Sequence, residues 1–140
     1  MLVTTKGRYA MRLMAYIASI PDRKVTLREV AEQESISLKY LEQLAHEMVK
    51  SGLLASVRGH GGGYTLAKNS DEIRAGDILR AAEGSTTPVS CAALEENGSC
   101  PREDTCSTIS FWSGLDRVIE EYVDSVTLAE FIGPSKLAVQ

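Results

Sequence analysis

The sequence predicts a mainly α-helical protein with one small β-hairpin and a long helix near the C-terminus. Apolar residues recur at helical spacing through most of residues 4–52. Two runs of strand-forming residues then flank the glycine-rich segment Arg58–Gly63, as in a hairpin. After Cys106 a narrow apolar stripe repeats in alternating steps of three and four. A chain of 140 residues can bury one core, so we expect a single compact unit with appendages.

Caps and apolar spacing predict three helices in the first third of the chain. Thr4 or Thr5 caps a helix that stops at Pro21, with an apolar face of Ala10, Leu13, Met14, Ile17 and Ala18. Thr26 opens a short second helix, with Glu29 three residues on in a capping-box arrangement and Leu27, Val30 and Ala31 on its buried side. Ser37 caps a third helix that ends at Gly52 and faces inward with Leu38, Leu41, Leu44, Ala45 and Met48. Two short helices around a tight turn predict a helix-turn-helix.

The outward face of the third helix and the hairpin predict a winged helix-turn-helix that binds double-stranded DNA. A polar stripe such as Lys39, Glu42, Gln43, His46 and Lys50 is, on its own, typical of a solvated face. The following strands, Leu53–Val57 and Tyr64–Leu66, carry a flexible glycine tip whose N–H groups can approach phosphates, and Arg58 can reach a phosphate or a narrow minor groove. Gln43 can pair with adenine, Glu42 can accept from cytosine or repel a wrong site, and Lys39 can hold phosphate or guanine. Neither a Walker lysine nor a following helix supports a nucleotide-binding loop.

The charge distribution agrees with that assignment although the whole chain carries −4. Residues 1–68 have ten Lys and Arg against six Asp and Glu, whereas residues 69–140 have five against thirteen. A basic half beside an acidic half suits a DNA-binding module joined to a regulatory or dimerising module, because phosphate neutralisation needs only one positive face.

The second half predicts two more helices separated by a polar loop. Ser70 caps a helix that runs through Ala75–Glu83, buries Ile73, Ile78, Leu79 and Ala82, and ends at Gly84. After the loop, Ser107 or Thr108 caps a long helix with the apolar stripe Trp112, Leu115, Ile119, Tyr122 and Val126. This stripe predicts a coiled-coil seam in a homodimer, with packing inside one chain as the alternative. Thr127 and Glu130 predict one more short helix before a tail to which we assign no role.

The three cysteines, Cys91, Cys100 and Cys106, all fall in the polar loop. Structural cysteines prefer cores, so a loop that gathers thiols suits a soft metal or a cluster. A disulfide would leave one cysteine unpaired, and zinc usually has closer ligand spacing and needs a fourth ligand. An iron–sulfur cluster suits three thiolates plus one other ligand, and bare redox thiols are the remaining alternative.

The stretches TTKGRYAMRLM, ISLKYLEQL and SVRGHGGGYTLAK resemble the winged-helix regulators typified by the iron–sulfur cluster regulator IscR, with relatives NsrR, RirA and CymR. The resemblance runs through nearly the whole chain. It implies that the third helix enters the major groove, through Ser37, Lys39, Tyr40, Glu42 and Gln43, and that Arg58 of the wing also contacts DNA. His60, Gly61 and Gly62 at the wing tip complete the predicted DNA contacts. The resemblance also favours crossed long helices in a homodimer and assigns an iron–sulfur cluster to Cys91, Cys100 and Cys106.

Two departures from the family pattern leave the cluster type open between 2Fe–2S and 4Fe–4S. Where IscR has a ligating histidine three residues after the last cysteine, this chain has Ile109. Where NsrR-like proteins use an acidic residue of the N-terminal helix, this chain offers Lys6, Arg8 and Arg12. The fourth ligand could be a small molecule or one of Glu95, Glu96, Glu103, Asp104 and Ser107.

We therefore expect a DNA-binding domain at residues 1–84, a sensor loop at 85–106, and a dimerisation helix with a tail at 107–140. The expected function is a cytoplasmic, homodimeric transcription regulator whose operator affinity depends on the cluster. The regulator would therefore respond to iron–sulfur status, redox state or nitric oxide. The alternative is a cluster-free regulator of the CymR kind that answers thiol oxidation or a partner protein. No nucleophile–base pair or paired catalytic carboxylates indicate an enzyme, so no small-molecule substrate is expected. Charges interrupt the N-terminal apolar run, which argues against a signal peptide or a membrane span.

Overall fold

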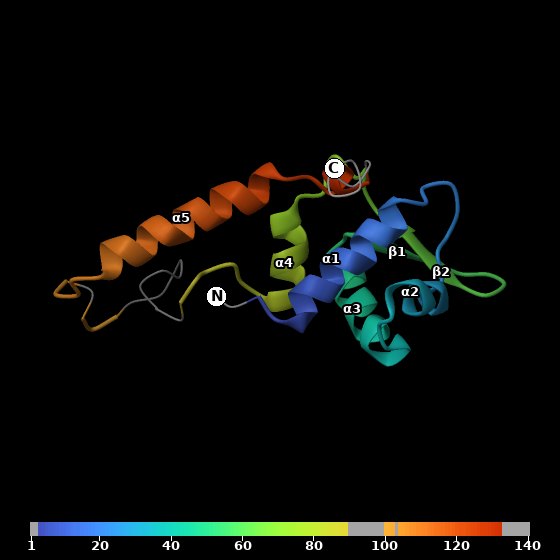
Figure 1. The fold of residues 1–140 in the computed structure, drawn as a ribbon, viewed down its shortest axis with the longest axis horizontal. Coiled ribbons are helices and arrows are strands. Elements are labelled where there is room, and N and C mark those ends of the chain that lie inside the picture. The colour runs from blue at the N-terminus through green and yellow to red at the C-terminus, as the bar shows by residue number, and fades with distance from the viewer. Residues whose placement is uncertain (1–2, 90–99, 103, 133–140) are drawn as a thin grey trace, which may run out of the picture.

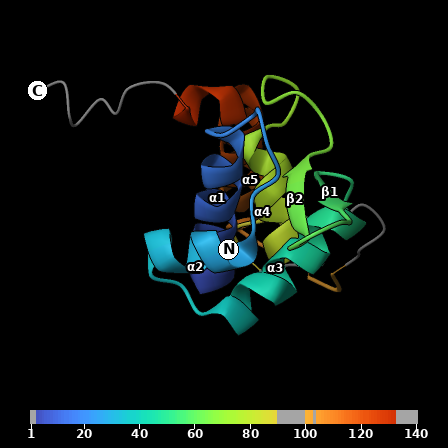
Figure 2. The same ribbon diagram turned by 90° about the vertical axis from the view of Figure 1, so that its right-hand side faces the viewer.

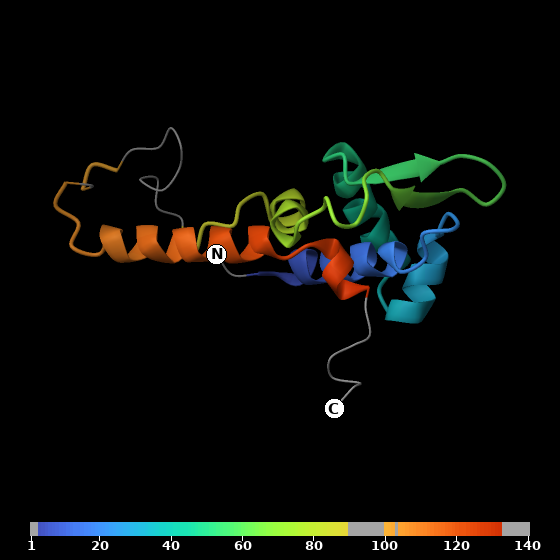
Figure 3. The same ribbon diagram turned by 90° about the horizontal axis from the view of Figure 1, so that it is seen from above.

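The computed structural model describes residues 3–89, 100–102 and 104–132, and its architecture confirms the predicted fold class. The helices are α1 (Thr5–Ala18), α2 (Leu27–Glu34), α3 (Leu38–Lys50), α4 (Ala75–Glu83) and α5 (Ile109–Ser125), with the 3₁₀ helix η2 (Leu128–Phe131) after them. The strands β1 (Leu54–Val57) and β2 (Gly63–Leu66) form an antiparallel hairpin. Helix α5 projects from the body at the end opposite the hairpin (Figure 1; Figure 3). No helix in the described ranges is long and apolar enough to cross a membrane.

The core forms where α1, α3 and α4 meet. The predicted apolar face of α1 is buried throughout, and the side chains that are almost completely buried include Leu13, Met14, Ile17, Leu41, Met48 and Ile78. Thr4, Thr26 and Ser37 cap their helices through the predicted side-chain oxygens. Leu38, Ala31 and Ala82 were predicted to face inward and lie half-buried at the margin of this core.

Glu29 differs from its predicted role in a capping box. Its N–H donates to Thr26 Oγ1 at 3.1 Å, but its carboxylate turns away from the Thr26 N–H. Instead it accepts hydrogen bonds from the Arg23 guanidinium at 2.8 and 2.9 Å and from the Tyr16 hydroxyl at 2.7 Å. These donors lower the pKa of Glu29 to about 2. The carboxylate therefore ties α1 to α2 instead of closing the cap.

The second half departs from the sequence prediction at both helix starts. Residues 70–72 form a turn, so Ser70 caps no helix, and Asp77 accepts from the Arg74 N–H at the start of α4 at 2.9 Å. Thr108 does precede α5, but its hydroxyl makes no capping bond and lies 3.4 Å from Cys106 Sγ. The short helix predicted from Thr127 and Glu130 is present as η2, with the capping box formed.

Most of the exposed large apolar side chains of α5 lie outside the predicted seam. Phe111, Val118 and Tyr122 are 62%, 61% and 68% exposed, and of these only Tyr122 belongs to the predicted stripe. Trp112, Leu115 and Ile119 are half-buried within the single chain, and Val126 follows the end of the helix. The apolar surface that α5 leaves exposed is therefore centred on positions 111, 118 and 122.

Candidate nucleic-acid interface

Helix α3 is fixed in the body by its apolar side and presents its polar side outward. Leu41, Leu44, Ala45 and Met48 are buried, whereas Lys39, Glu42, Gln43 and His46 are exposed. Ser37 Oγ accepts from the Tyr40 N–H at 3.3 Å and so fixes the start of the helix. The Tyr40 ring is half-buried and packs edge-on against Tyr9, with 5.7 Å between centroids. Tyr40 therefore contacts α1 and is only partly available to DNA.

The hairpin pairs Leu54 with Leu66 and Val57 with Gly63, which carries its tip away from the body. Arg58, His60 and Gly61 are exposed at that tip, and Gly62 is half-buried. Gly59, Gly61 and Gly62 all have positive φ, and the Gly62 N–H donates to the Gly59 carbonyl at 3.0 Å, so the tip is a tight glycine turn. Residues 53–68 contain no Asp or Glu, which leaves the hairpin with net positive charge.

Helix α3 and the hairpin, which carry the predicted DNA-contact residues, lie at the same end of the molecule, away from α5 (Figure 1). Figure 2 views the protein from this end and shows α2, α3 and the hairpin in front. Within the described ranges, no hydrogen bond or ion pair engages the side chains of Lys39, Glu42, Gln43 or Arg58. These polar groups are therefore available to an external partner.

The outer face of α3 also borders a groove of about 740 Å³. One wall is formed by Lys39, Tyr40, Glu42, Gln43, His46 and Glu47. The facing wall comes from Lys6 at the start of α1 and from residues 81–84 at the end of α4. Sequence reasoning did not place these segments beside α3, because their proximity depends on the packing of α1 and α4 against each other.

Glu83, the last residue of α4, holds the N-terminus of α1. Its carboxylate accepts from the Thr4 N–H at 2.6 Å, from the Thr4 hydroxyl at 2.9 Å and from the Gly7 N–H at 3.2 Å. Desolvation opposes ionisation of Glu83, but these donors outweigh it and lower the pKa of Glu83. A Cβ at Gly7 would lie 2.8 Å from Glu83 Oε2, so glycine is needed for this approach. The residue that precedes Gly84 and the cysteine loop thus bonds directly to the first helix of the body.

Two of the three cysteines lie in the described part of the loop. Cys100 and Cys106 are half-buried free thiols, and Cys91 lies outside the described residues. The hydroxyl of Thr108, together with the N–H groups of Thr108 and Ile109 at the start of α5, lowers the pKa of Cys106. The thiolate that a metal requires is therefore favoured at Cys106.

The described residues supply part of the predicted metal site. Soft thiolates suit iron, so the donor chemistry of Cys100 and Cys106 fits an iron–sulfur cluster. Across residues 3–89, 100–102 and 104–132, however, no group of three His, Cys, Asp or Glu side chains could hold a metal ion. Ile109 begins α5 with an aliphatic side chain that cannot ligate. Glu95, Glu96 and Glu103, three of the predicted candidates for a fourth ligand, lie outside the described residues.

A joint connects α4 to the C-terminal end of α5. Arg80 donates to Asp124 at 2.5 Å, and the Ala75 N–H donates to the Val126 carbonyl at 2.8 Å. The Leu128 N–H donates to the Ile73 carbonyl at 2.7 Å. The direction of α5 is therefore fixed relative to the body at this end.

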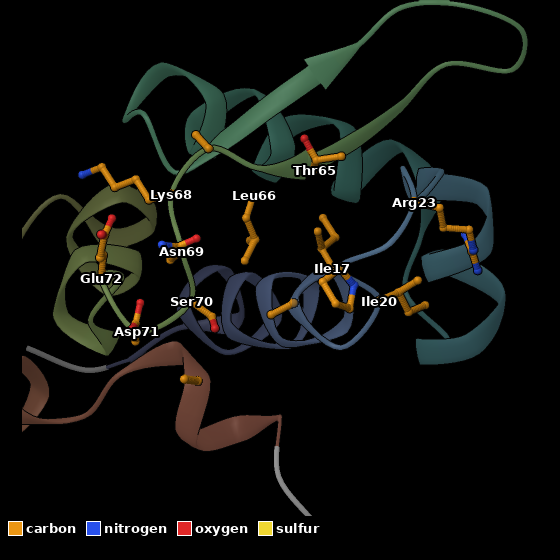
Figure 4. A pocket seen from close by; sticks show the side chains of 14 residues that line it. Ile17, Ile20, Arg23, Thr65, Leu66, Lys68, Asn69, Ser70, Asp71 and Glu72 are labelled. Carbon is orange, nitrogen blue, oxygen red and sulfur yellow. The ribbon is translucent and has the colours of Figure 1, made fainter.

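A further pocket of about 770 Å³ lies between the end of α1 and the segment after β2 (Figure 4). Ile17, Ile20 and Leu66 supply apolar lining, and Lys68 and Asp71 supply opposite charges. It shares no lining residue with the α3 groove and is separate from the candidate interface.

Comparisons with known proteins agree with this geometry. The model of the Rrf2 family, described as iron-dependent transcriptional regulators, matches residues 3–134. An HTH-type transcriptional regulator IscR of Pectobacterium atrosepticum is 40% identical over 133 residues, which cover 94% of this chain and 79% of the relative. The IscR of Serratia proteamaculans is 38% identical over 140 residues, covering 99% and 84%.

Solved structures of regulators share the fold. The structure of CymR, the global cysteine regulator of B. subtilis, superposes with a TM-score of 0.75 at 32% identity and covers 94% of this chain and 96% of that one. IscR of T. potens superposes with a TM-score of 0.73 at 33% identity and covers 100% and 97%. The matched proteins are regulators, which confirms the expectation that this protein is not an enzyme. The chain belongs to the Rrf2 family of winged helix-turn-helix transcriptional regulators.

Proposed function

We propose that this regulator is a cytoplasmic homodimer that binds operator DNA with α3 in the major groove and the hairpin as a wing. The observation that carries the proposal is that Lys39, Glu42 and Gln43 on α3 and Arg58 on the hairpin are exposed, on elements that lie at the same end of the molecule. Side chains on a helix can read base edges, and a basic glycine tip can approach phosphates or the minor groove. Ser37, His60, Gly61 and Gly62 border this face and complete the proposed contacts.

The proposal of a homodimer rests on the apolar surface of α5. Phe111, Val118 and Tyr122 are spaced by seven and four residues, so they lie along one side of the helix. None of the residues of α5 is buried in the single chain. A second copy would cover this surface, and two-fold symmetry would set the separation of the two α3 helices.

We further propose that Cys91, Cys100 and Cys106 hold an iron–sulfur cluster that controls operator affinity. The IscR-named relatives and the lowered pKa of Cys106 support this assignment. A bound cluster would supply one-electron chemistry and sensitivity to oxidants, and hence two states of the loop. Residues 85–106 follow directly after Glu83 and Gly84, which both border the α3 groove, and Glu83 also holds the start of α1. A change in the loop therefore has a short covalent path to the DNA-binding face.

The alternative is a cluster-free regulator that responds through thiol chemistry or a partner protein. The likeness to CymR of B. subtilis supports it, since that protein is the global cysteine regulator of that organism. The half-buried Cys106, with its lowered pKa, also suits a reactive thiol.

Anaerobic purification separates the two possibilities. Visible absorption, iron and sulfide are measured on the wild type, on Cys91→Ala and on Thr105→Ala as a control in the same loop. We expect a coloured protein with iron and sulfide that fades in Cys91→Ala and persists in Thr105→Ala. A colourless wild type that stays free of iron after reconstitution would favour the cluster-free regulator.

The DNA-binding face is tested by affinity for operator DNA. Gln43→Ala and Arg58→Ala should weaken binding and leave the iron content unchanged, whereas Glu72→Gln, outside this face, should bind as the wild type does. Cys100→Ala should lose iron and keep binding at cluster-independent sites. Wild-type affinity in Arg58→Ala would contradict the assignment of the wing.

A further inference from the structure

The segment that precedes α2 pairs with the hairpin through a single antiparallel bridge between Val25 and Tyr64. The Val25 N–H donates to the Tyr64 carbonyl and the Tyr64 N–H donates to the Val25 carbonyl, both at 2.9 Å. Gly63 has a φ of 151°, and a Cβ there would lie 3.1 Å from the Lys24 side chain and the Val25 carbonyl. A glycine at this position therefore allows Lys24 to pass closely under the hairpin.

The side chain of Lys24 reaches the tip of the wing. Its Nζ donates to the His60 carbonyl at 2.9 Å, and it lies 3.6 Å from the position of a Cβ on Gly59. The ammonium group has three N–H donors, so this bond leaves two of them for another acceptor. The main-chain carbonyl of the tip thus holds the positive charge beside the glycine turn.

No carboxylate neutralises Lys24 within the described ranges, whereas the adjacent Arg23 pairs with Glu29 at 2.8 Å. Lys24 is half-buried as a residue, but the bond between its ammonium and the His60 carbonyl is exposed, so the positive charge stays accessible from outside. The hairpin itself contains Arg58 and Lys68 and no acidic residue. A wing tip with this unneutralised positive charge is suited to bind an external anion.

We propose that Lys24 is a DNA-backbone contact of the wing, with its ammonium held by the His60 carbonyl for bonding to a phosphate. The inference rests on the proposed DNA-binding face and adds to it a residue from outside the recognition helix and the hairpin. In this arrangement one side chain both braces the wing tip and neutralises a phosphate. Arg58, which directly follows β1, remains an exposed basic side chain of the wing.

The test uses Lys24→Met, which keeps the aliphatic stem beside Gly63 and removes the charge. Affinity for operator DNA is measured by fluorescence anisotropy between about 0.05 and 0.5 M salt. Each phosphate contact contributes a slope of about −0.9 in log K against log salt, so relative to 1 M salt the loss of one contact should weaken binding about fivefold at 0.15 M, and the loss of one contact in each subunit of the dimer about 25-fold. We expect this loss, and a slope that is less steep by about 0.9 for each Lys24 that contacts DNA. Lys24→Arg should keep the wild-type slope.

Lys68→Met is the matched control, because it removes the same charge from the base of the hairpin. If both variants lose the same affinity for DNA, Lys24 contributes only general electrostatic attraction, and the proposed phosphate contact is wrong. Weaker binding with an unchanged slope would show a bracing role alone, and unchanged binding would remove Lys24 from the interface. Either result overturns the inference. Gln43→Ala and Arg58→Ala are measured in parallel: if they too bind as the wild type does, the proposed DNA-binding face itself fails.

Discussion

Gly76 lies where α4 meets the end of α5, and its replacement by alanine tests that joint. A Cβ at Gly76 would lie 2.7 Å from an Arg80 guanidinium nitrogen and 2.9 Å from Val123 Cγ2, and closest of all to Asp124 Oδ1. The backbone there is ordinary helix, where alanine would otherwise gain about 1 kcal/mol over glycine. The added methyl group must therefore displace Asp124 and Val123 or break the bond between Arg80 and Asp124.

The clash outweighs the gain in helix propensity. Overpacking costs about 1–3 kcal/mol, and the partly exposed ion pair contributes about 0.5 kcal/mol. We expect Gly76→Ala to lower the free energy of unfolding by about 1–2 kcal/mol, measured by urea denaturation at fixed protein concentration. The loss should shrink when Gly76→Ala is introduced into Asp124→Ser, which removes the nearest atom. A Gly76→Ala protein more stable than the wild type would refute the close approach of α4 and α5.

Three further predictions concern the body of the protein. Glu29→Gln should lower stability by about 1–3 kcal/mol, because Arg23 and Tyr16 lose a charged acceptor. The folded-state pKa of Glu29, about 2, lies below the usual 4.5, so the contribution of Glu29 to stability is present above pH 4.5 and is lost as pH falls towards 2. In a plot of the free energy of unfolding against pH, the fall at acid pH should therefore be less steep for Glu29→Gln than for the wild type. Met14→Ala should cost about 2–5 kcal/mol, because its side chain is fully buried, and a change below 1 kcal/mol by denaturation would contradict that burial. Ser35 has a φ of 55° after α2, so Ser35→Gly should raise the thermal midpoint, and a lower one would count against this left-handed conformation.

Local signals in the sequence were enough to predict most of the fold. Thr4, Thr26 and Ser37 cap their helices because a side-chain oxygen before an apolar period satisfies nearby N–H groups. The apolar faces of α1 and α3 are buried as their spacing predicts. The glycine tip likewise predicted the hairpin, since its positive φ values are costly for other residues.

Features that depend on long-range packing could not be predicted in this way. The carboxylate of Glu29 accepts hydrogen bonds from Arg23 and Tyr16, which lie outside α2, and does not bond to the Thr26 N–H as a capping box would require. The exposed surface of α5 also differs from its apolar periodicity, because part of the predicted seam is covered within the chain. At the candidate interface, the exposure of Lys39 and Gln43 follows from helical spacing. The proximity of Glu83 to α1 and to the α3 groove follows only from the packing of α1 on α4.

In the proposed function, the state of the cysteine loop sets the affinity of α3 and the wing for DNA. The most direct measurement is the affinity for operator DNA of anaerobically purified protein before and after removal of its iron, with Cys106→Ala treated in the same way. We expect at least a tenfold difference between the two wild-type states, equivalent to about 1.4 kcal/mol, and no difference in Cys106→Ala. Equal affinity of both wild-type states at every DNA site would contradict the claim.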